Sequence, residues 1–172
     1  MSSPRVKPWL DEDPAPAELI TSIKSRRPNG ELIGIDRVLL RSFPLAKGWN
    51  DLLGRVRANF SLKLEYRELI MCRVAVLNRA EFEWKVHKPD YIAAGGTEEK
   101  CDALFSKDYS PLFGEEERAL LELTDQSTLN IEVSESTIDR VKLLFGERQT
   151  VEAVATVAAY NMVSRFLVAL KV

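Results

Sequence analysis

The sequence predicts an all-α protein, because apolar residues recur at helical spacing through most of the chain. Glycine and proline number only eight each, and five of the prolines fall within the first 28 residues. No segment shows the apolar–polar alternation of a strand, and no repeat of fixed period is present. A chain of 172 residues is long enough for one core and short for two. We therefore expect one helical domain over residues 14–172, preceded by an extension over residues 1–13.

The amino-terminal residues predict an extension followed by a short helix. Trp9 and Leu10 are too apolar for a solvated tail, so we expect the extension to dock on a protein surface, which could be that of a neighbouring subunit. Pro14 and Pro16 suit the start of a helix. The turn residues Pro28–Gly30 should end it.

Capping and breaking residues place the next helices. Asp36 can cap one helix, which should break or kink at Phe43–Pro44, and another helix should cover about residues 46–59. Further along, Gly95–Gly96 should end a helix, and Thr97 should cap the one that follows.

The carboxyl-terminal part predicts a loop, two helices and a long final helix. Ser110–Pro111 marks the loop, and the acidic run Glu115–Glu117 complements the dipole at the start of a helix. Ser134 should cap the next helix and Gly146 should end it. The final helix, about residues 147–170, is apolar nearly all round, as expected in a core or an oligomer interface.

The final helix is also apolar enough to raise the question of a membrane span. Glu152, Asn161 and Arg165 interrupt its apolar run, and such side chains are costly in lipid. We therefore expect a buried helix and no membrane partner.

The stretch over residues 65–96 concentrates the ionisable groups of a candidate site. His87 is the only histidine, so any imidazole chemistry must occur here. Glu68 lies on an apolar helix, while Glu83, His87 and Tyr91 follow at steps of four and form one stripe on the next helix. Because a carboxylate and an imidazole are costly to bury unless they are paired, we interpret Glu68, Glu83 and His87 as a catalytic group brought together by two consecutive helices.

Two other interpretations of these side chains stay open. Glu83 and His87 can form a general acid–base couple in which the carboxylate orients the imidazole, but they could also be an exposed salt bridge. A metal ion on Glu68, Glu83 and His87 is chemically conceivable. One imidazole and two carboxylates with no further histidine form a small ligand set, so we do not expect a metal there.

Four further residues are candidates for substrate binding. Cys72, one turn after Glu68, could line the pocket as a thiol or be a small buried hydrophobic residue. Tyr91 could donate a hydrogen bond to a substrate, or lie in the core with its hydroxyl at the surface. Asn161 and Arg165 are four apart on the final helix, where a buried guanidinium must meet an anion. That anion could be a substrate carboxylate or an internal one.

Composition and charge argue against several classes of protein. The net charge is −2, and Arg26–Arg27 is an isolated basic pair, so the basic surface expected of a nucleic-acid-binding protein is missing. The first 16 residues contain acids and no apolar signal core. Cys72 and Cys101 are too far apart in sequence for a redox or zinc motif. We therefore expect free thiols and a cytoplasmic location.

Several segments together resemble the carboxymuconolactone decarboxylase and alkylhydroperoxidase-D-like family, an all-helical family of small oligomeric proteins. The resemblance covers roughly the last two thirds of the chain. It lies in RELIMCRVAVLN, AEFEWKVH, AAGGTEE, EEERALLEL and YNMVSRFLVAL, at residues 67–78, 80–87, 93–99, 115–123 and 160–170.

The resemblance implies which branch of the family this chain is similar to. In the peroxidase branch, the helix that here starts at Ala80 carries Cys-x-x-Cys followed four residues later by a histidine, and an upstream glutamate relays protons. By position the histidine is His87 and the glutamate is Glu68, while Ala80 and Glu83 replace the two cysteines. A dithiol peroxidase needs a low-pKa thiolate and a resolving partner. The chain thus looks like the decarboxylase-like branch.

Members of that branch, where their substrate is known, act without a cofactor on small carboxylated lactones. The resemblance therefore implies a homo-oligomeric, cofactor-independent enzyme that acts on a small carboxylated compound by glutamate and histidine acid–base chemistry. One alternative is a family member that binds a ligand without catalysis. Another is a thiol-dependent peroxidase that uses Cys72 or Cys101.

Overall fold

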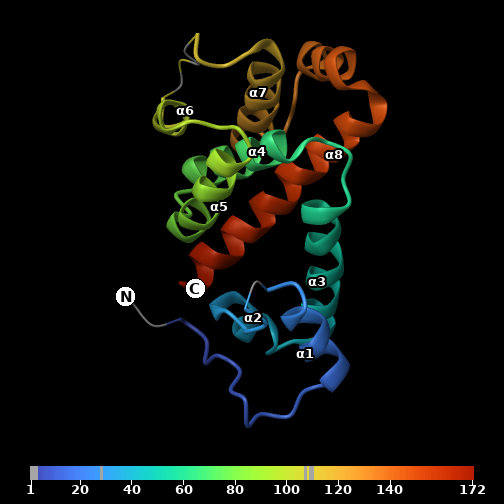
Figure 1. The fold of residues 1–172 in the computed structure, drawn as a ribbon, viewed down its shortest axis with the longest axis vertical. Coiled ribbons are helices and arrows are strands. Elements are labelled where there is room, and N and C mark those ends of the chain that lie inside the picture. Colours follow the sequence, from blue (N-terminus) through green and yellow to red (C-terminus); the bar gives the residue numbers. More distant parts are fainter. Residues whose placement is uncertain (1–3, 28, 107, 109–110) are drawn as a thin grey trace. The chain divides into compact units, whose positions relative to one another are not determined.

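The computed structural model describes residues 4–27, 29–106, 108 and 111–172, and every regular element in these ranges is a helix. The predicted all-α class is thus confirmed. Residues 1–3, Pro28 and Ser110, for which the sequence predicts parts of the extension and two loops, lie outside the described ranges. The helices, in chain order, are α1 (Ala17–Lys24), α2 (Gly34–Leu39), α3 (Phe43–Ala58), α4 (Leu64–Leu77), α5 (Glu81–Ala93), α6 (Glu98–Ala103), α7 (Glu115–Leu129) and α8 (Glu135–Leu170) (Figure 1).

The chain divides into two compact units. The first contains the residues up to Asn59 together with Leu167–Val172, and the second spans Phe60–Phe166. The first unit therefore holds α1 to α3, and the second holds α4 to α7 and most of α8. The expectation of a single domain from residue 14 stays a prediction.

In the first unit, the extension docks on its own chain. Trp9 is buried, its backbone N–H donates to the carbonyl oxygen of Arg37 at 2.9 Å, and the Arg37 guanidinium lies 5.9 Å from the centre of the Trp9 ring. Asp36 lies within α2, where it accepts from the Ile33 N–H at 3.0 Å. The break expected at Phe43–Pro44 is instead the start of α3, because proline is well tolerated in the first turn of a helix.

In the second unit, a tight turn joins α4 to α5. The N–H of Arg79 donates to the carbonyl of Val76 at 3.2 Å, and the N–H of Ala80 donates to the carbonyl of Ala75 at 2.9 Å. Arg79 has a φ of 55°, so these contacts form a left-handed helix-ending motif. The turn reverses the chain, and α5 then packs extensively against α4.

The end of α5 uses the same motif with glycine. Gly95 has a φ of 125°, and the N–H of Gly96 donates to the carbonyl of Tyr91 at 2.9 Å. The Thr97 hydroxyl then accepts from the N–H of Lys100 at 3.2 Å, which confirms the predicted cap of α6.

The long helix α8 is broken where the sequence predicts a helix end. Gly146 has φ 73° and ψ 170°, a conformation that glycine adopts readily, and helical residues lie on both sides of it. Ser134 caps the first part, accepting from the N–H of Thr137 at 3.3 Å. Within the described ranges, α8 is the one helix that is long and apolar enough to cross a membrane, and half of its most apolar window is buried in the fold.

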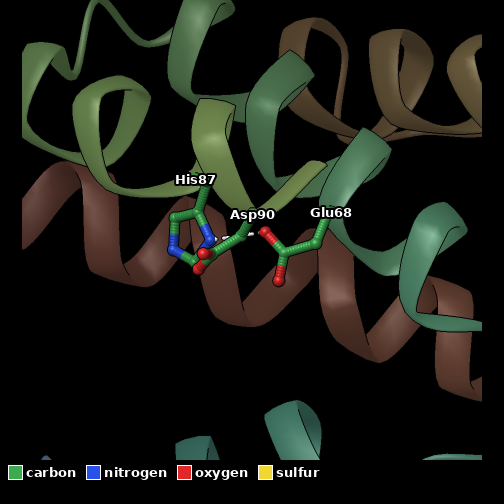
Figure 2. A group of neighbouring side chains, drawn as sticks. All are labelled: Glu68, His87 and Asp90. Carbon is green, nitrogen blue, oxygen red and sulfur yellow. Dashed lines mark hydrogen bonds and ion pairs between the residues drawn. The ribbon is translucent and has the colours of Figure 1, made fainter. Parts of the chain in front are cut away.

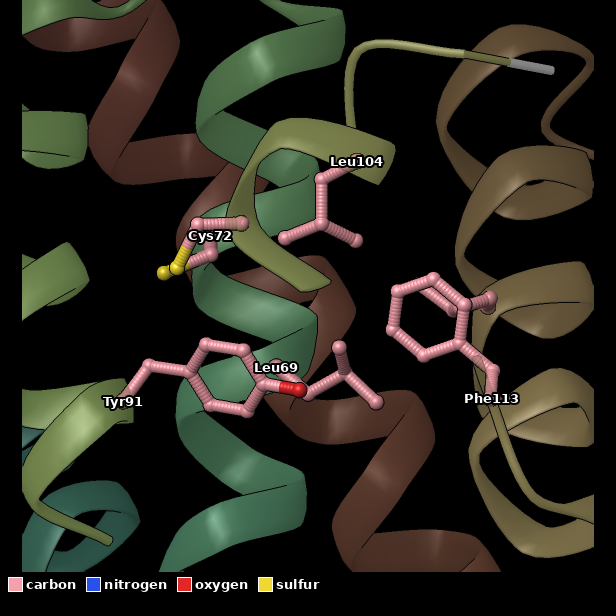
Figure 3. Close-up of a cluster of buried hydrophobic side chains, with 7 residues drawn as sticks. Leu69, Cys72, Tyr91, Leu104 and Phe113 are labelled. Carbon is pink, nitrogen blue, oxygen red and sulfur yellow. The ribbon is translucent and has the colours of Figure 1, made fainter. Parts of the chain in front are cut away.

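The core of the second unit lies between α4, α5, α6 and α7 (Figure 3). Both cysteines are in it as free thiols, which agrees with the sequence prediction. The buried residues of this cluster are Leu69, Cys72, Tyr91, Cys101, Leu104, Phe113 and Leu121.

A prediction tests the packing at the end of α5. A Cβ atom at Gly96 would lie 2.6 Å from the ring of Tyr91, which is fully buried. Gly96→Ala should therefore lower the free energy of unfolding by about 1–3 kcal/mol, because the ring must move inside a packed core. Gly48→Ala is the control, since nothing lies within 4 Å of its new methyl group inside α3. A Gly96→Ala protein that melts at or above the wild-type temperature would contradict this packing.

Candidate functional site

The candidate site is a buried ion pair between two helices. Nδ1 of His87, on α5, lies 2.7 Å from Oε2 of Glu68, on α4 (Figure 2). Both side chains are buried, with about one twentieth of each exposed. The turn at Arg79 allows this contact, because it packs the second helix directly against the first. The structure therefore brings together two of the three predicted catalytic side chains in hydrogen-bonding contact.

Glu83, the third predicted catalytic residue, lies on the other side of the imidazole. Its Oε2 is 3.3 Å from Nε2 of His87, one helical turn along α5, and it is also buried. The contact is within ion-pair distance but does not meet the geometry of a hydrogen bond, and neither atom has a hydrogen-bond partner among the described residues. We therefore infer that the hydrogen bond with Glu68 contributes more than Glu83 does to fixing the orientation of the imidazole ring. Nε2 is therefore the ring nitrogen that makes an ion pair and no hydrogen bond among the described residues.

Burial and charge act in opposite directions on His87. Burial of the ring lowers its pKa, but the contacts and the negative charges of Glu68 and Glu83 outweigh burial and raise the pKa from 6.5 to about 9. The imidazole is thus held as a cation at neutral pH. On α8, the ring of Tyr160 stands edge-on to it, with 5.0 Å between the ring centres.

Asp90 is a neighbour that the sequence prediction missed. It follows His87 by three residues on α5, and its carboxylate is exposed. One donor atom from each of Glu68, His87 and Asp90 lies within 4.8 Å of the others (Figure 2). The sequence did contain a signal for this neighbour: Asp90 is three residues after His87, and residues three apart on a helix lie next to each other on its surface.

The same three side chains offer carboxylate and imidazole donors of the kind that divalent cations bind. Two ligands of an ion with bonds of about 2.1 Å stay about 3 Å or more apart. The 2.7 Å contact between Glu68 and His87 is shorter than that. An ion would therefore have to replace this hydrogen bond to be held by both residues.

Two of the predicted substrate-binding residues lie in the hydrophobic core. Cys72 and Tyr91 are fully buried members of the core cluster, and burial raises the pKa of both side chains. The Tyr91 hydroxyl lies 3.5 Å from Oε1 of Glu117, which is also buried, so the expectation of a hydroxyl at the surface is wrong. Cys72 thus has the environment of the alternative interpretation, a small buried hydrophobic residue.

Asn161 and Arg165 contact each other on α8. Nη1 of Arg165 donates to Oδ1 of Asn161 at 2.7 Å, and Nδ2 of Asn161 donates to Oγ1 of Thr128 at 2.9 Å. The expectation of a buried guanidinium is wrong, because Arg165 is exposed. Residues on an apolar helix can still face outward, and the sequence does not tell which face is covered. The role of Arg165 in substrate binding stays a prediction.

The comparisons with known proteins decide the family. The model of the carboxymuconolactone decarboxylase family matches residues 44–126, a range that contains Glu68, Glu83, His87 and Asp90. The uncharacterized protein YdfG of Bacillus subtilis strain 168 is 30% identical over 112 residues, which are 64% of this chain and 76% of that protein. The chain belongs to the carboxymuconolactone decarboxylase family.

Two crystal structures have the same fold as this family member. A protein of unknown function from Agrobacterium tumefaciens, provisionally assigned as the antioxidant defence protein AhpD, has a TM-score of 0.71 and 22% identity, covering 81% of this chain and 94% of its own. An uncharacterized peroxidase-related protein from Silicibacter sp. TM1040 has a TM-score of 0.79 and 16% identity, covering 99% and 93%. At these identities the likeness shows the AhpD-like helical fold alone.

A prediction follows from the raised pKa of His87. Because the chain has a single histidine, NMR of labelled imidazole reports this site only. We expect a midpoint near pH 9, and Glu68→Gln should lower it. The folded pKa lies above the unfolded value of 6.5, so protonation stabilises the fold. This stability is fully present below about pH 6.5 and should be lost as the pH rises through about 9. A midpoint at or below 6.5 would mean that burial outweighs the carboxylates.

Proposed function

We propose that the protein is a cofactor-independent enzyme that transfers protons to or from a small carboxylated compound of the lactone type. The observation that supports this most is the buried imidazole of His87, set between Glu68 at 2.7 Å and Glu83 at 3.3 Å. Buried titratable groups with such partners are concentrated at functional sites. Membership of the carboxymuconolactone decarboxylase family supports the choice of a small carboxylated compound as the substrate.

In the decarboxylation that we propose, the bond between the substrate carbon and its carboxylate carbon breaks. Carbon dioxide leaves, and the electron pair stays on the substrate carbon as an enolate conjugated with a carbonyl group. His87 then gives the proton on Nε2 to that carbon and becomes neutral. The positive charge of the imidazole also stabilises the enolate as it forms. Glu68 keeps the ring oriented through Nδ1, and Glu83 lies beside the reacting nitrogen.

The same groups suit two related reactions. A neutral His87 could take a proton from a carbon next to a carbonyl group, or activate water to open a lactone. The class of chemistry, which is proton transfer by an imidazole between two carboxylates, is the same in all three cases. A family member that binds such a compound without turnover is the alternative function.

A thiol-dependent peroxidase is less well supported. Cys72 and Cys101 are both fully buried, and burial raises the pKa of both thiols. Peroxidase chemistry needs an accessible thiolate, which these surroundings disfavour. Free thiols in the core also support a reducing, cytoplasmic setting as part of the proposal.

Turnover on a panel of small carboxylated lactones and of hydroperoxides tests the function. Glu83→Gln and His87→Ala should each reduce lactone turnover by about 10²–10⁴-fold, because each removes part of the acid–base couple. Cys72→Ala should change the rate by a small factor, and treatment with a chelator should change nothing. Circular dichroism checks that each variant keeps its helices.

Each outcome of the panel has a distinct meaning. A raised melting temperature without turnover would favour the ligand-binding alternative. Turnover of a hydroperoxide that Cys72→Ala abolishes would overturn the proposal in favour of thiol chemistry.

We also propose that the protein is a homo-oligomer through α8. Val151, Val154 and Met162 lie on one side of this helix, and all three are exposed apolar side chains. A second copy of the chain is the occupant that we expect for this face, because it offers the same apolar surface in return.

Light scattering should give a mass that is a multiple of 19.5 kDa at micromolar concentration. Val151→Asp should shift the protein toward the monomer, because it places a charge in the apolar contact. Ile131→Asn is the control, since Ile131 is exposed outside that face and its φ of 68° suits asparagine. A wild-type monomer, or a protein that binds lipid vesicles through α8, would contradict the proposal.

A further inference from the structure

We propose that a pocket in the first unit, between α1 and α3, binds an apolar α-amino acid as its zwitterion. The pocket has a volume of about 620 Å³, within the range of about 300–1,000 Å³ that small-molecule sites have. All of its lining residues belong to the first unit, whereas His87 and its carboxylate partners belong to the second. The inference therefore concerns other residues than the acid–base site, and it does not depend on the proposed reaction.

Contacts between α1 and α3 build the walls of this pocket. Nδ2 of Asn50 donates to Oγ of Ser22 at 2.9 Å, and Gly54 faces the side chain of Arg26. The second contact lies four residues after the first in both segments, so the two helices run side by side in the same direction here. The residues one to two turns before these contacts, on each helix, line the pocket.

The pocket offers an apolar surface to a ligand side chain. Leu19 of α1 and Phe43 of α3 are half-buried and lie on its two walls. Pro16 and Pro44 add rigid rings to the lining. An apolar group that enters the pocket is removed from water, which favours binding in proportion to the area that it buries.

A buried amide adds hydrogen-bond donors to this lining. Asn50 is 6% exposed, and its Oδ1 accepts from Nε of Arg26. Its Nδ2 carries two protons, and in the described part of the chain one contact is found for them, the one with Ser22. The Ser22 hydroxyl accepts that proton and can donate its own. Two donors at the wall of the pocket are thus available to a ligand carboxylate.

Charged side chains of both signs line the same pocket. They are Glu18 on α1, and Lys47 and Asp51 on α3. None of the three forms an ion pair within 4 Å with another described residue, whereas Arg37 and Asp11 of the same unit pair at 3.1 Å. A ligand ammonium group fits the two carboxylates, and a ligand carboxylate fits the ammonium group of Lys47.

This set of charges favours a zwitterion over simpler ligands. An apolar anion would meet Lys47 but also the carboxylates of Glu18 and Asp51. An apolar cation would meet the carboxylates but leave Lys47 without a partner. A zwitterion gives each charge an opposite one, and like charges brought together would weaken the other two classes. An apolar α-amino acid joins both charges to a group that suits the apolar walls.

A matched set of probes that share a phenyl ring tests which charges the pocket recognises. The probes are L-phenylalanine, 3-phenylpropanoate, 2-phenylethylamine and the neutral 3-phenylpropan-1-ol, with L-leucine as a second amino acid. Each is titrated into the untagged full chain, and the backbone amide signals are followed by NMR. We expect a Kd of about 1 mM or lower for L-phenylalanine, with shifts concentrated in α1 and α3. The other phenyl probes should bind about tenfold more weakly, because each lacks at least one charge.

Variants separate the parts of the two charges. Lys47→Gln should weaken binding of L-phenylalanine and 3-phenylpropanoate by about three- to tenfold, and should not weaken binding of 2-phenylethylamine. Glu18→Gln should weaken binding of L-phenylalanine and 2-phenylethylamine instead. Both residues are exposed, so the fold should persist. Arg55→Gln is the matched control, because Arg55 is an exposed cation on α3 outside the lining, and it should change no affinity.

Four results would overturn the proposal. One is the absence of saturable binding of both amino acids at about 10 mM. Another is equal affinity for the neutral alcohol, because the pocket would then select for apolar surface alone. The third is equal weakening by Lys47→Gln and Arg55→Gln. The fourth is a set of shifts confined to the residues around His87, which would place the amino acid in the second unit.

Discussion

The contact between Glu68 and His87 constrains the whole α4–α5 pair. It buries charged groups from two helices at 2.7 Å, and a buried ion that loses its partner costs about 3–5 kcal/mol. Neither helix can rotate or slide without separating the two side chains. The hydrophobic core works in the same direction, because it packs Leu69 of α4 together with Tyr91 of α5. The polar contact and the apolar core thus specify one arrangement.

Two other buried charges in the same unit show what complete pairing looks like. Arg73 donates to both carboxylate oxygens of Asp125 at 2.7 Å, and to backbone carbonyls. Glu152 accepts from the hydroxyl of Ser61 and the N–H of Leu62, both at 2.8 Å. These groups use their hydrogen-bonding capacity inside the protein. Among the described residues, Nε2 of His87 and Oε2 of Glu83 form an ion pair at 3.3 Å but have no hydrogen-bond partner. Buried polar atoms without a hydrogen bond in a native fold call for an explanation. A role of this pair in proton transfer is such an explanation.

Much of the fold and part of the site were predictable from local chemistry. Thr97, Ser134 and Gly146 mark helix boundaries because their side chains or their freedom at positive φ act within a few residues. Glu68 and His87 were predictable as a pair because an apolar helix cannot bury either one alone. The exposure of Arg165 was not predictable, since it depends on which face of α8 is covered. Asp90 was missed because an exposed acid on a helix is common, and only the tertiary contact between α4 and α5 makes it a neighbour of Glu68.

The left-handed turn at Arg79 makes the site sensitive to chain length. The turn leaves no flexible linker between α4 and α5, because the N–H groups of Arg79 and Ala80 both donate hydrogen bonds to carbonyl groups in the last turn of α4. One residue inserted after Ala80 would rotate every side chain of α5 by about 100° relative to α4. His87 would then leave Glu68, although both helices could persist. Substitutions can therefore change the chemistry of this site gradually, whereas insertions and deletions in the turn would remove it in a single step.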